Sequence, residues 1–124
     1  MRTLLFGFTF AVALLVLPGC DRGEACTSDL RPSVVVDVVD AETAEPVATA
    51  VVTFTIDGGA EQLPNPLNVP DEGEFVLEYE KDGLFAVTIE ADGYEPAYVE
   101  YDVAEDGCHV VSVYDTVELV PVAP

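Results

Sequence analysis

The sequence predicts an all-β fold: a single small antiparallel β-sandwich that follows an N-terminal signal segment. Three observations predict it. Apolar and polar residues alternate with a period of two through most of the chain after position 33. Turn-forming clusters such as "DGG", "PNP", "KDG" and "EDG" recur between these stretches. No stretch after the signal segment is convincingly helical, so we expect roughly six to eight short strands in one domain.

The first 17 residues have the pattern of a bacterial export signal. They contain one charge, Arg2, and then an apolar run from Leu4 to Leu17. This run is short for a membrane span. The alternative is a buried helix, but a helix without a polar face needs cover on every side, and the rest of this short chain cannot supply it.

The sequence "LPGC" at positions 17–20 resembles the bacterial lipobox at Leu17, Gly19 and Cys20. The resemblance implies that residues 1–19 are a lipoprotein signal peptide. It also implies that Cys20 becomes the first residue of the mature chain and carries a diacylglycerol anchor. An anchor of two or three acyl chains holds a protein to the membrane effectively permanently. Asp21 resembles the signal that retains enterobacterial lipoproteins at the inner membrane. We therefore expect an envelope lipoprotein on the cell membrane or outer membrane, facing the periplasm or the exterior. The alternative is a secreted protein in which Cys20 is an ordinary thiol.

The other two cysteines, Cys26 and Cys108, are expected to form a disulfide bond. An acylated Cys20 cannot pair, which leaves these two in the oxidising environment that an exported chain meets. On the chain-entropy account, closing this long loop stabilises the fold by roughly 4.5 kcal/mol.

Residues 20–32 form a polar tether without periodicity, and residues 33–124 form the domain. Alternation predicts strands over 33–40, 50–56, 74–80, 84–90 and 97–103. The run 108–120 is long enough for two strands, or for one strand with a bulge near Asp115. The side chains expected to face the core are Val34, Val36, Val38, Ala50, Val52, Phe54, Ile56, Phe75, Leu77, Tyr79, Phe85, Val87, Ile89, Val99, Tyr101 and Val103.

The charge of the chain is strongly negative. All 24 acidic residues follow the signal segment, against Arg22, Arg31 and Lys81. Such a surface repels nucleic acid and anionic headgroups, so neither is an expected partner. The chain is 50% hydrophobic, which argues against disorder. A highly solvated surface explains this charge better than a specific basic partner does.

Three segments, taken in order, resemble carboxypeptidase regulatory-like domains. They are "VVVDVVDAETAEPVATAVVTF" from Val34, "DEGEFVL" from Asp71 and "LFAVTIEADGYEP" from Leu84. The resemblance implies a seven-stranded transthyretin-like or immunoglobulin-like sandwich that serves as a surface module without catalysis. It also implies structural roles for five motif residues: Pro46, Gly73, Phe75, Gly93 and Tyr94. Independently of it, glycines suit turns with positive φ, and a tyrosine buries its ring with the hydroxyl at the rim. The last strand resembles the cysteine-containing strand of related bacterial surface lipoproteins, which again pairs Cys26 with Cys108.

The sequence contains few of the residue combinations that known catalytic sites require. With His109 as the single histidine, the chain cannot assemble a zinc carboxypeptidase or blue-copper site. Ser28, Ser33 and Ser112 lack the sequence context of a serine nucleophile. We expect no catalytic residue and no cofactor, and we expect His109 to be a structural sheet or loop histidine.

Two kinds of ligand site stay open. Calcium prefers several oxygen ligands, and its candidate ligands are Asp71, Glu72 and Glu74, with Glu80 and Asp82 in the next acidic loop. Carbohydrate binding has little support because the chain contains no tryptophan. Of the tyrosines, Tyr98 and Tyr114 are expected to face outward.

We therefore expect a non-catalytic, lipid-anchored envelope protein, monomeric, whose sandwich serves as a structural or binding and adhesion module. Its partner would be an envelope protein or a polysaccharide. The alternatives are a calcium-dependent or other ligand-binding domain and a soluble transthyretin-like carrier without lipid.

Overall fold

A computed structural model describes residues 26–65 and 72–123. The predictions for the signal segment, Cys20 and Asp71 lie outside these residues. The described chain is all-β and without helix, as predicted. Its strands are β1 (Val34–Asp40), β2 (Val51–Ile56), β3 (Glu74–Val76), β4 (Gly83–Glu90), β5 (Ala97–Val103) and β6 (Val113–Leu119). Within these residues there is no helix with the length and hydropathy needed to cross a membrane.

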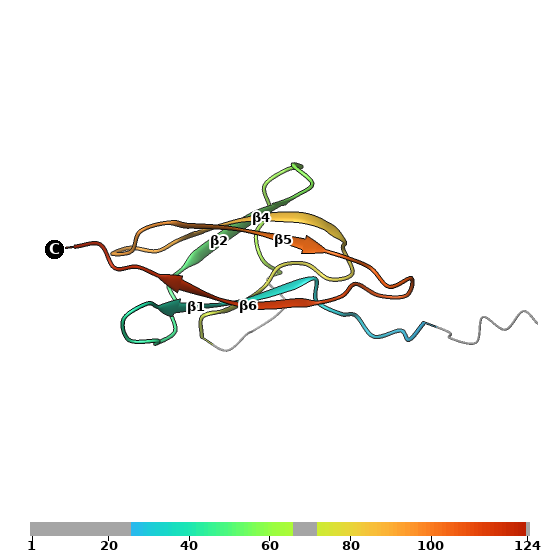
Figure 1. The fold of residues 1–124 in the computed structure, drawn as a ribbon, viewed down its shortest axis with the longest axis horizontal. Coiled ribbons are helices and arrows are strands. Elements are labelled where there is room, and N and C mark those ends of the chain that lie inside the picture. Colours follow the sequence, from blue (N-terminus) through green and yellow to red (C-terminus); the bar gives the residue numbers. More distant parts are fainter. Residues whose placement is uncertain (1–25, 66–71, 124) are drawn as a thin grey trace, which may run out of the picture.

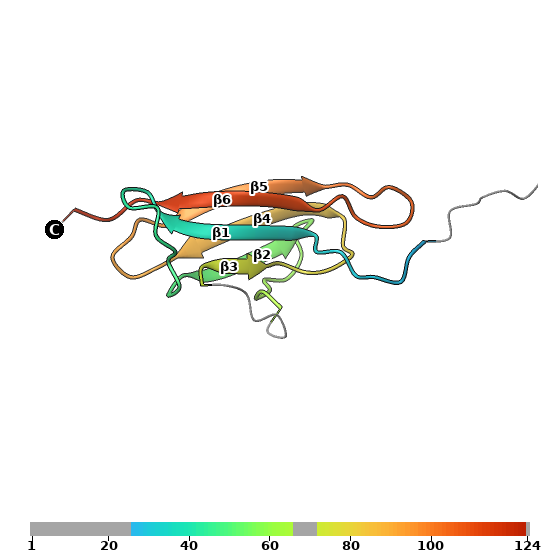
Figure 2. The ribbon, with the colours of Figure 1, turned by 90° about the horizontal axis from the view of Figure 1, so that it is seen from below.

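The strands form two three-stranded sheets that lie face to face (Figures 1 and 2). One sheet has the order β3-β1-β6 and the other β2-β4-β5. Both sheets contribute side chains to one hydrophobic core, which fills the space between them. This two-layer arrangement is compatible with the predicted β-sandwich.

The prediction of a purely antiparallel arrangement is wrong for one strand pair. β1 and β6 are parallel over their whole length, from Val34 opposite Val113 to Asp40 opposite Leu119. The first and last strands therefore point the same way. The N-terminal segment enters at one end of the molecule and the chain leaves at the other, beside the C label (Figures 1 and 2).

The core follows the predicted alternation. In β1, Val34, Val36 and Val38 are fully buried and Asp37 is exposed, although Val35 on the other face is buried as well. On the inner face of the second sheet, the rings of Phe54 in β2 and Phe85 in the neighbouring β4 stack with their centroids 5.7 Å apart. Burying one such side chain stabilises the fold by about 1.5–3 kcal/mol. The inner faces of the strands therefore contribute most of the stability.

Two predicted strands have different bounds in the structure. The strand over 74–80 ends after Val76, because Glu78 and Glu80 adopt positive φ angles of 93° and 52°. Leu77 is still fully buried, but Tyr79 is only partly so. In the run 108–120, β6 is one continuous strand and shows no bulge at Asp115, since it pairs with β1 throughout.

The end of the molecule that carries the C-terminus is tied together by polar contacts. The Tyr94 hydroxyl donates a hydrogen bond to Asp40 Oδ2 over 2.7 Å, which links the β4–β5 turn to the end of β1. The chain after β6 pairs with the same turn through Glu95 N to Val120 O and Val122 N to Gly93 O. The last residues therefore connect both sheets.

Candidate functional site

The N-terminal segment is attached to the opposite end of the domain by a disulfide bond. Cys26 and Cys108 form the expected disulfide, with their Cα atoms 5.1 Å apart and 82 positions apart in sequence. Residues 26–32, which were predicted to belong to a tether, thus contact the domain. Pro32 continues this contact through a bridge to Tyr79.

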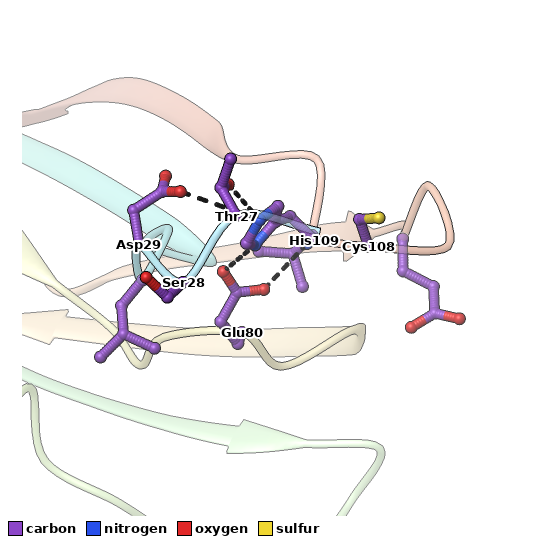
Figure 3. Close-up of a pocket in the computed structure, with 9 residues that line it drawn as sticks. Thr27, Ser28, Asp29, Glu80, Cys108 and His109 are labelled. Carbon is purple, nitrogen blue, oxygen red and sulfur yellow. Dashed lines mark hydrogen bonds and ion pairs between the residues drawn. The ribbon is translucent and has the colours of Figure 1, made fainter. Parts of the chain in front are cut away.

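His109 lies next to this disulfide and connects three segments of the chain (Figure 3). Its Nδ1 is 2.6 Å from Glu80 Oε1, which precedes β4. Its Nε2 is 2.9 Å from Thr27 Oγ1, on the N-terminal segment. The residue is 7% exposed, so both ring nitrogens satisfy their hydrogen bonds within the protein.

Glu80 accepts several hydrogen bonds at this point. The Arg31 amide donates to Oε1 over 2.8 Å, and the Val110 amide donates to Oε2 over 3.3 Å. Partial burial acts to raise the pKa of the Glu80 carboxyl. The hydrogen bonds from the Arg31 amide, His109 and the Val110 amide outweigh that effect, so the pKa lies below its usual value. Glu80 is therefore an ionised acceptor.

Asp29 lies on the other side of the imidazole. Its Oδ1 is 4.0 Å from His109 Nε2, and its Oδ2 is 3.5 Å from the Arg31 Nε. A hydrogen bond from the Thr27 hydroxyl is the main cause that lowers the pKa of the Asp29 carboxyl, with Arg31 and His109 adding to it. Asp106 fixes the backbone here, since its Oδ1 accepts from the amides of Cys108 and His109.

These side chains border an open hollow of about 310 Å³ (Figure 3), which is lined by Thr27, Ser28, Asp29, Leu30, Glu80, Glu105, Cys108, His109 and Val110. The hydroxyl of Thr27, the imidazole of His109 and the carboxylate of Glu80 follow one another as they do in a catalytic triad. In such a triad the hydroxyl is the nucleophile, the imidazole is its base and the carboxylate orients the base. Here, however, the imidazole is buried. The arrangement is better suited to holding the N-terminal segment than to attacking a substrate.

Two of the calcium candidates, Glu72 and Glu74, lie in the described part of the chain. Glu72 is exposed before β3, and Glu74 lies in β3 opposite Asp37, while Asp71 is outside the described residues. Within residues 26–65 and 72–123 there is no group of three or more His, Cys, Asp or Glu side chains that could hold a metal ion.

Tyr98 and Tyr114 face outward as predicted, with 72% and 70% of their surface exposed. They belong to different sheets, Tyr98 to β5 and Tyr114 to β6. Tyr98 borders a shallow hollow of about 340 Å³ over β4 and β5, which is also lined by Thr88 and Glu100.

The five motif residues occupy structural positions. Gly73 and Gly93 have positive φ angles of 79° and 86°. Pro46 forms a bridge with Val39 and lies against Gly73. Phe75 and Tyr94 pack against the core while partly exposed, and the Tyr94 hydroxyl reaches the rim, as predicted.

The cluster of Thr27, Asp29, Glu80 and His109 was not predicted from the sequence. Glu80 was expected on the outward face of the strand over 74–80 and as a candidate calcium ligand only. One signal was available: Thr27 and His109 each directly follow a cysteine of the expected disulfide. A bond between those cysteines brings their neighbours together.

Comparison with known proteins does not identify the chain. No family model matches it, and no curated protein matches it. The resemblance to carboxypeptidase regulatory-like domains stays a prediction.

Proposed function

We propose that this chain is a non-catalytic, lipid-anchored envelope protein whose β-sandwich acts as a structural or binding module. Cys20 would carry the lipid, and the domain would face the periplasm or the exterior. The resemblance of "LPGC" to a lipobox, and of the strand pattern to carboxypeptidase regulatory-like domains, supports this proposal.

The observation that carries the proposal is the position of the Cys26–Cys108 bond. Five residues, Asp21 to Ala25, separate the proposed lipidated cysteine from Cys26. A fully extended chain over that distance spans at most about 20 Å. The domain would therefore stand close to the bilayer with its disulfide end toward the anchor, a geometry that suits a surface module.

The opposite end would then face away from the membrane. The β1–β2 connection, the β4–β5 turn and the C-terminal segment meet there (Figure 1). Val120 and Val122 are about half exposed on that segment, and a hollow of about 300 Å³ lies beside Val51 and Ala91. This end is the surface that the module would offer to an envelope protein or polysaccharide.

Detergent-phase partitioning tests the anchor. The wild-type chain is expected in the detergent phase after expression in a bacterial host, and Cys20→Ser in the aqueous phase. The matched control is Cys26→Ser with Cys108→Ser, which removes two cysteines and leaves Cys20. Wild type in the aqueous phase would overturn the lipid anchor and favour the soluble carrier.

A further inference from the structure

The backbone of β5 can be divided into residues that bond β4 and residues that do not. The carbonyl oxygen of Leu84, in β4, accepts from the amide of Asp57, which follows β2, so the backbone groups of Leu84 point toward β2. These directions alternate along a strand. The backbone groups of Val87 therefore point toward β5, where Val99 lies opposite. Val99 thus uses its own backbone groups within the sheet.

Three residues of β5 alternate with Val99 and point their N–H and C=O groups to the free side of the strand: Tyr98, Glu100 and Asp102. Within residues 26–65 and 72–123, β5 pairs with β4 alone, and no backbone bond reaches these groups. A sheet edge of this kind is a ready template for another strand.

The chain limits this open stretch at both ends. Before β5, the Glu95 amide donates to the carbonyl oxygen of Val120, and after β5 the carbonyl oxygen of Ala104 accepts from the Val111 amide. These contacts join the two ends of β5 to the two ends of β6, which lies on the same side of the molecule (Figures 1 and 2). The open stretch therefore runs from residue 98 to residue 102.

The other edge strands are less accessible to a partner. β3 has three residues, which is short for an edge that pairs with another chain. In β2, the amide and the carbonyl oxygen of Phe54 both bond the backbone of Gln62. In β6, the Thr116 amide donates to Asp115 Oδ1 over 2.9 Å. Among the edges in the described part of the chain, β5 therefore offers the longest uninterrupted stretch.

The side chains along this stretch indicate the chemistry of a partner strand. On the outer face, Tyr98 and Glu100 border the hollow of about 340 Å³, and Asp102 is exposed on the same face. A lysine or arginine beside them would pair with a carboxylate and lie against the tyrosine ring. On the inner face, Val99 and Tyr101 are partly exposed, so an apolar side chain beside them would cover them.

We propose that the β5 edge binds an extended segment of a partner protein in which lysine or arginine alternates with apolar residues. The segment adds a strand beside residues 98–102, with its basic side chains on the outer face and its apolar side chains toward the core. A second copy of this chain is a poor occupant, because the chain has a formal net charge of −20 and like charges on paired strands repel. The inference rests on the proposed role as a binding module, and it does not depend on the lipid anchor.

Hydrogen exchange measured by nuclear magnetic resonance tests the edge directly. The mature full-length chain, in micelles of an uncharged detergent, is mixed with the probe peptide acetyl-Lys-Val-Lys-Val-Lys-Val-Lys-amide. At a peptide concentration of about ten times the Kd, exchange of the Tyr98, Glu100 and Asp102 amides is expected to slow about tenfold. The Val99 amide, which faces β4, is the internal reference and should be protected with and without peptide.

Charge alone also attracts a basic peptide to this acidic domain, so two methylated peptides serve as controls. One carries N-methyl groups on its lysines and the other on its valines, and both keep the charge of the parent peptide. An added strand bonds β5 through only one of its own edges. One methylated peptide should therefore bind at least about tenfold more weakly, and the other should bind like the parent. Equal binding of all three peptides, or no slowing of exchange at the three edge amides, would overturn the proposal.

Three variants locate the site on the protein. Glu100→Pro removes an N–H group on the free side of β5 and leaves the bonds to β4 in place, so it should abolish the slowing at Tyr98 and Asp102. Glu100→Gln keeps the N–H group and loses the charge, and should weaken binding about threefold. Glu42→Gln makes the same change of charge in the turn after β1 and should have no effect. Unchanged binding in Glu100→Pro, with the Val99 amide still protected, would refute the site.

Cys20→Ser separates this inference from the proposed anchor. Peptide binding is expected to be the same with and without the lipid. Binding that is retained in a wild-type chain found to lack the lipid would refute the proposed localisation alone, and a lipidated chain that does not bind the peptide would refute the strand site alone.

Discussion

Gly73 lies directly against Pro46. A Cβ atom on Gly73 would sit 2.9 Å from Pro46 Cβ and 2.8 Å from the carbonyl oxygen of Val38. The two residues come from different turns, one between β1 and β2 and the other just before β3. The chain can pass here only because residue 73 has no side chain and adopts a φ of 79°.

Gly73→Ala should therefore destabilise the domain more than Gly93→Ala. Both positions have positive φ, which costs roughly 1 kcal/mol for a residue with a Cβ. Only Gly73 also meets backbone and ring atoms, and relieving such overlap costs about a further 1–3 kcal/mol. Urea denaturation of both variants measures the difference. Equal losses would show that the contact with Pro46 is not tight.

Reduction of the Cys26–Cys108 bond should lower the free energy of unfolding by about 2–5 kcal/mol. The bond closes a loop of 82 positions, so it restricts a large part of the unfolded chain. Urea denaturation with and without reductant gives the difference, and Cys26→Ser with Cys108→Ser serves as a reductant-insensitive control. If mass spectrometry found both thiols free in the exported protein, the bond would be absent in the cell.

Tyr101 should make the domain sensitive to alkali. Burial, and then the 2.5 Å hydrogen bond to Asp115, raise the pKa of Tyr101 above its ordinary value of 10.0. A pKa that is higher in the folded than in the unfolded state gives stability that is complete below about pH 10 and is lost as the pH rises further. Tyr101→Phe should reduce this alkaline loss, and at neutral pH it should cost about 0.5–1.5 kcal/mol for the hydrogen bond.

Urea denaturation at about pH 7 and pH 10.5 tests this prediction. Tyr98→Phe is the matched control, because Tyr98 is on the same strand and largely exposed. If Tyr98→Phe removed as much of the alkaline loss as Tyr101→Phe, the effect would not come from the bond to Asp115.

The alternation along the chain was enough to predict the all-β fold and most of the core. It worked because β2 and β4 each bury one face, so Val52, Phe54, Phe85 and Val87 keep a period of two. In β1 the pattern is less clean, because Val35 is also buried. Pairing direction was not predictable in this way. Strands in parallel and antiparallel pairs have the same period, and β1 and β6 are far apart in the chain.

Only the proximity of Thr27 and His109 could be predicted from the sequence, through the expected disulfide; the rest of the cluster could not be, for a similar reason. Thr27, Glu80 and His109 come from three segments whose spacing follows no local pattern. Glu80 also looked like an outward residue of a strand, but the positive φ at Glu78 and Glu80 ends that strand and turns the carboxylate toward the histidine. Positive φ angles at glutamate residues cannot be recognised from the amino-acid sequence.

Asp40 should make the domain sensitive to acid. The Tyr94 hydroxyl, and then the amides of Glu42 and Thr43, hold the pKa of the Asp40 carboxyl below its ordinary value of 3.8. A pKa that is lower in the folded than in the unfolded state gives stability that is present above about pH 4 and is lost as the pH falls through the folded value. Asp40→Asn keeps an oxygen that can accept from the two amides but cannot ionise. Asp40→Asn should lower the free energy of unfolding at neutral pH and flatten its dependence on pH below about 4.

The control is Asp37→Asn, an exposed position on the same strand. Urea midpoints from about pH 7 to pH 2.5 measure both effects, and an acid slope that is unchanged in Asp40→Asn would assign the acid sensitivity to the other carboxylates with lowered pKa, Asp29, Glu80 and Asp106.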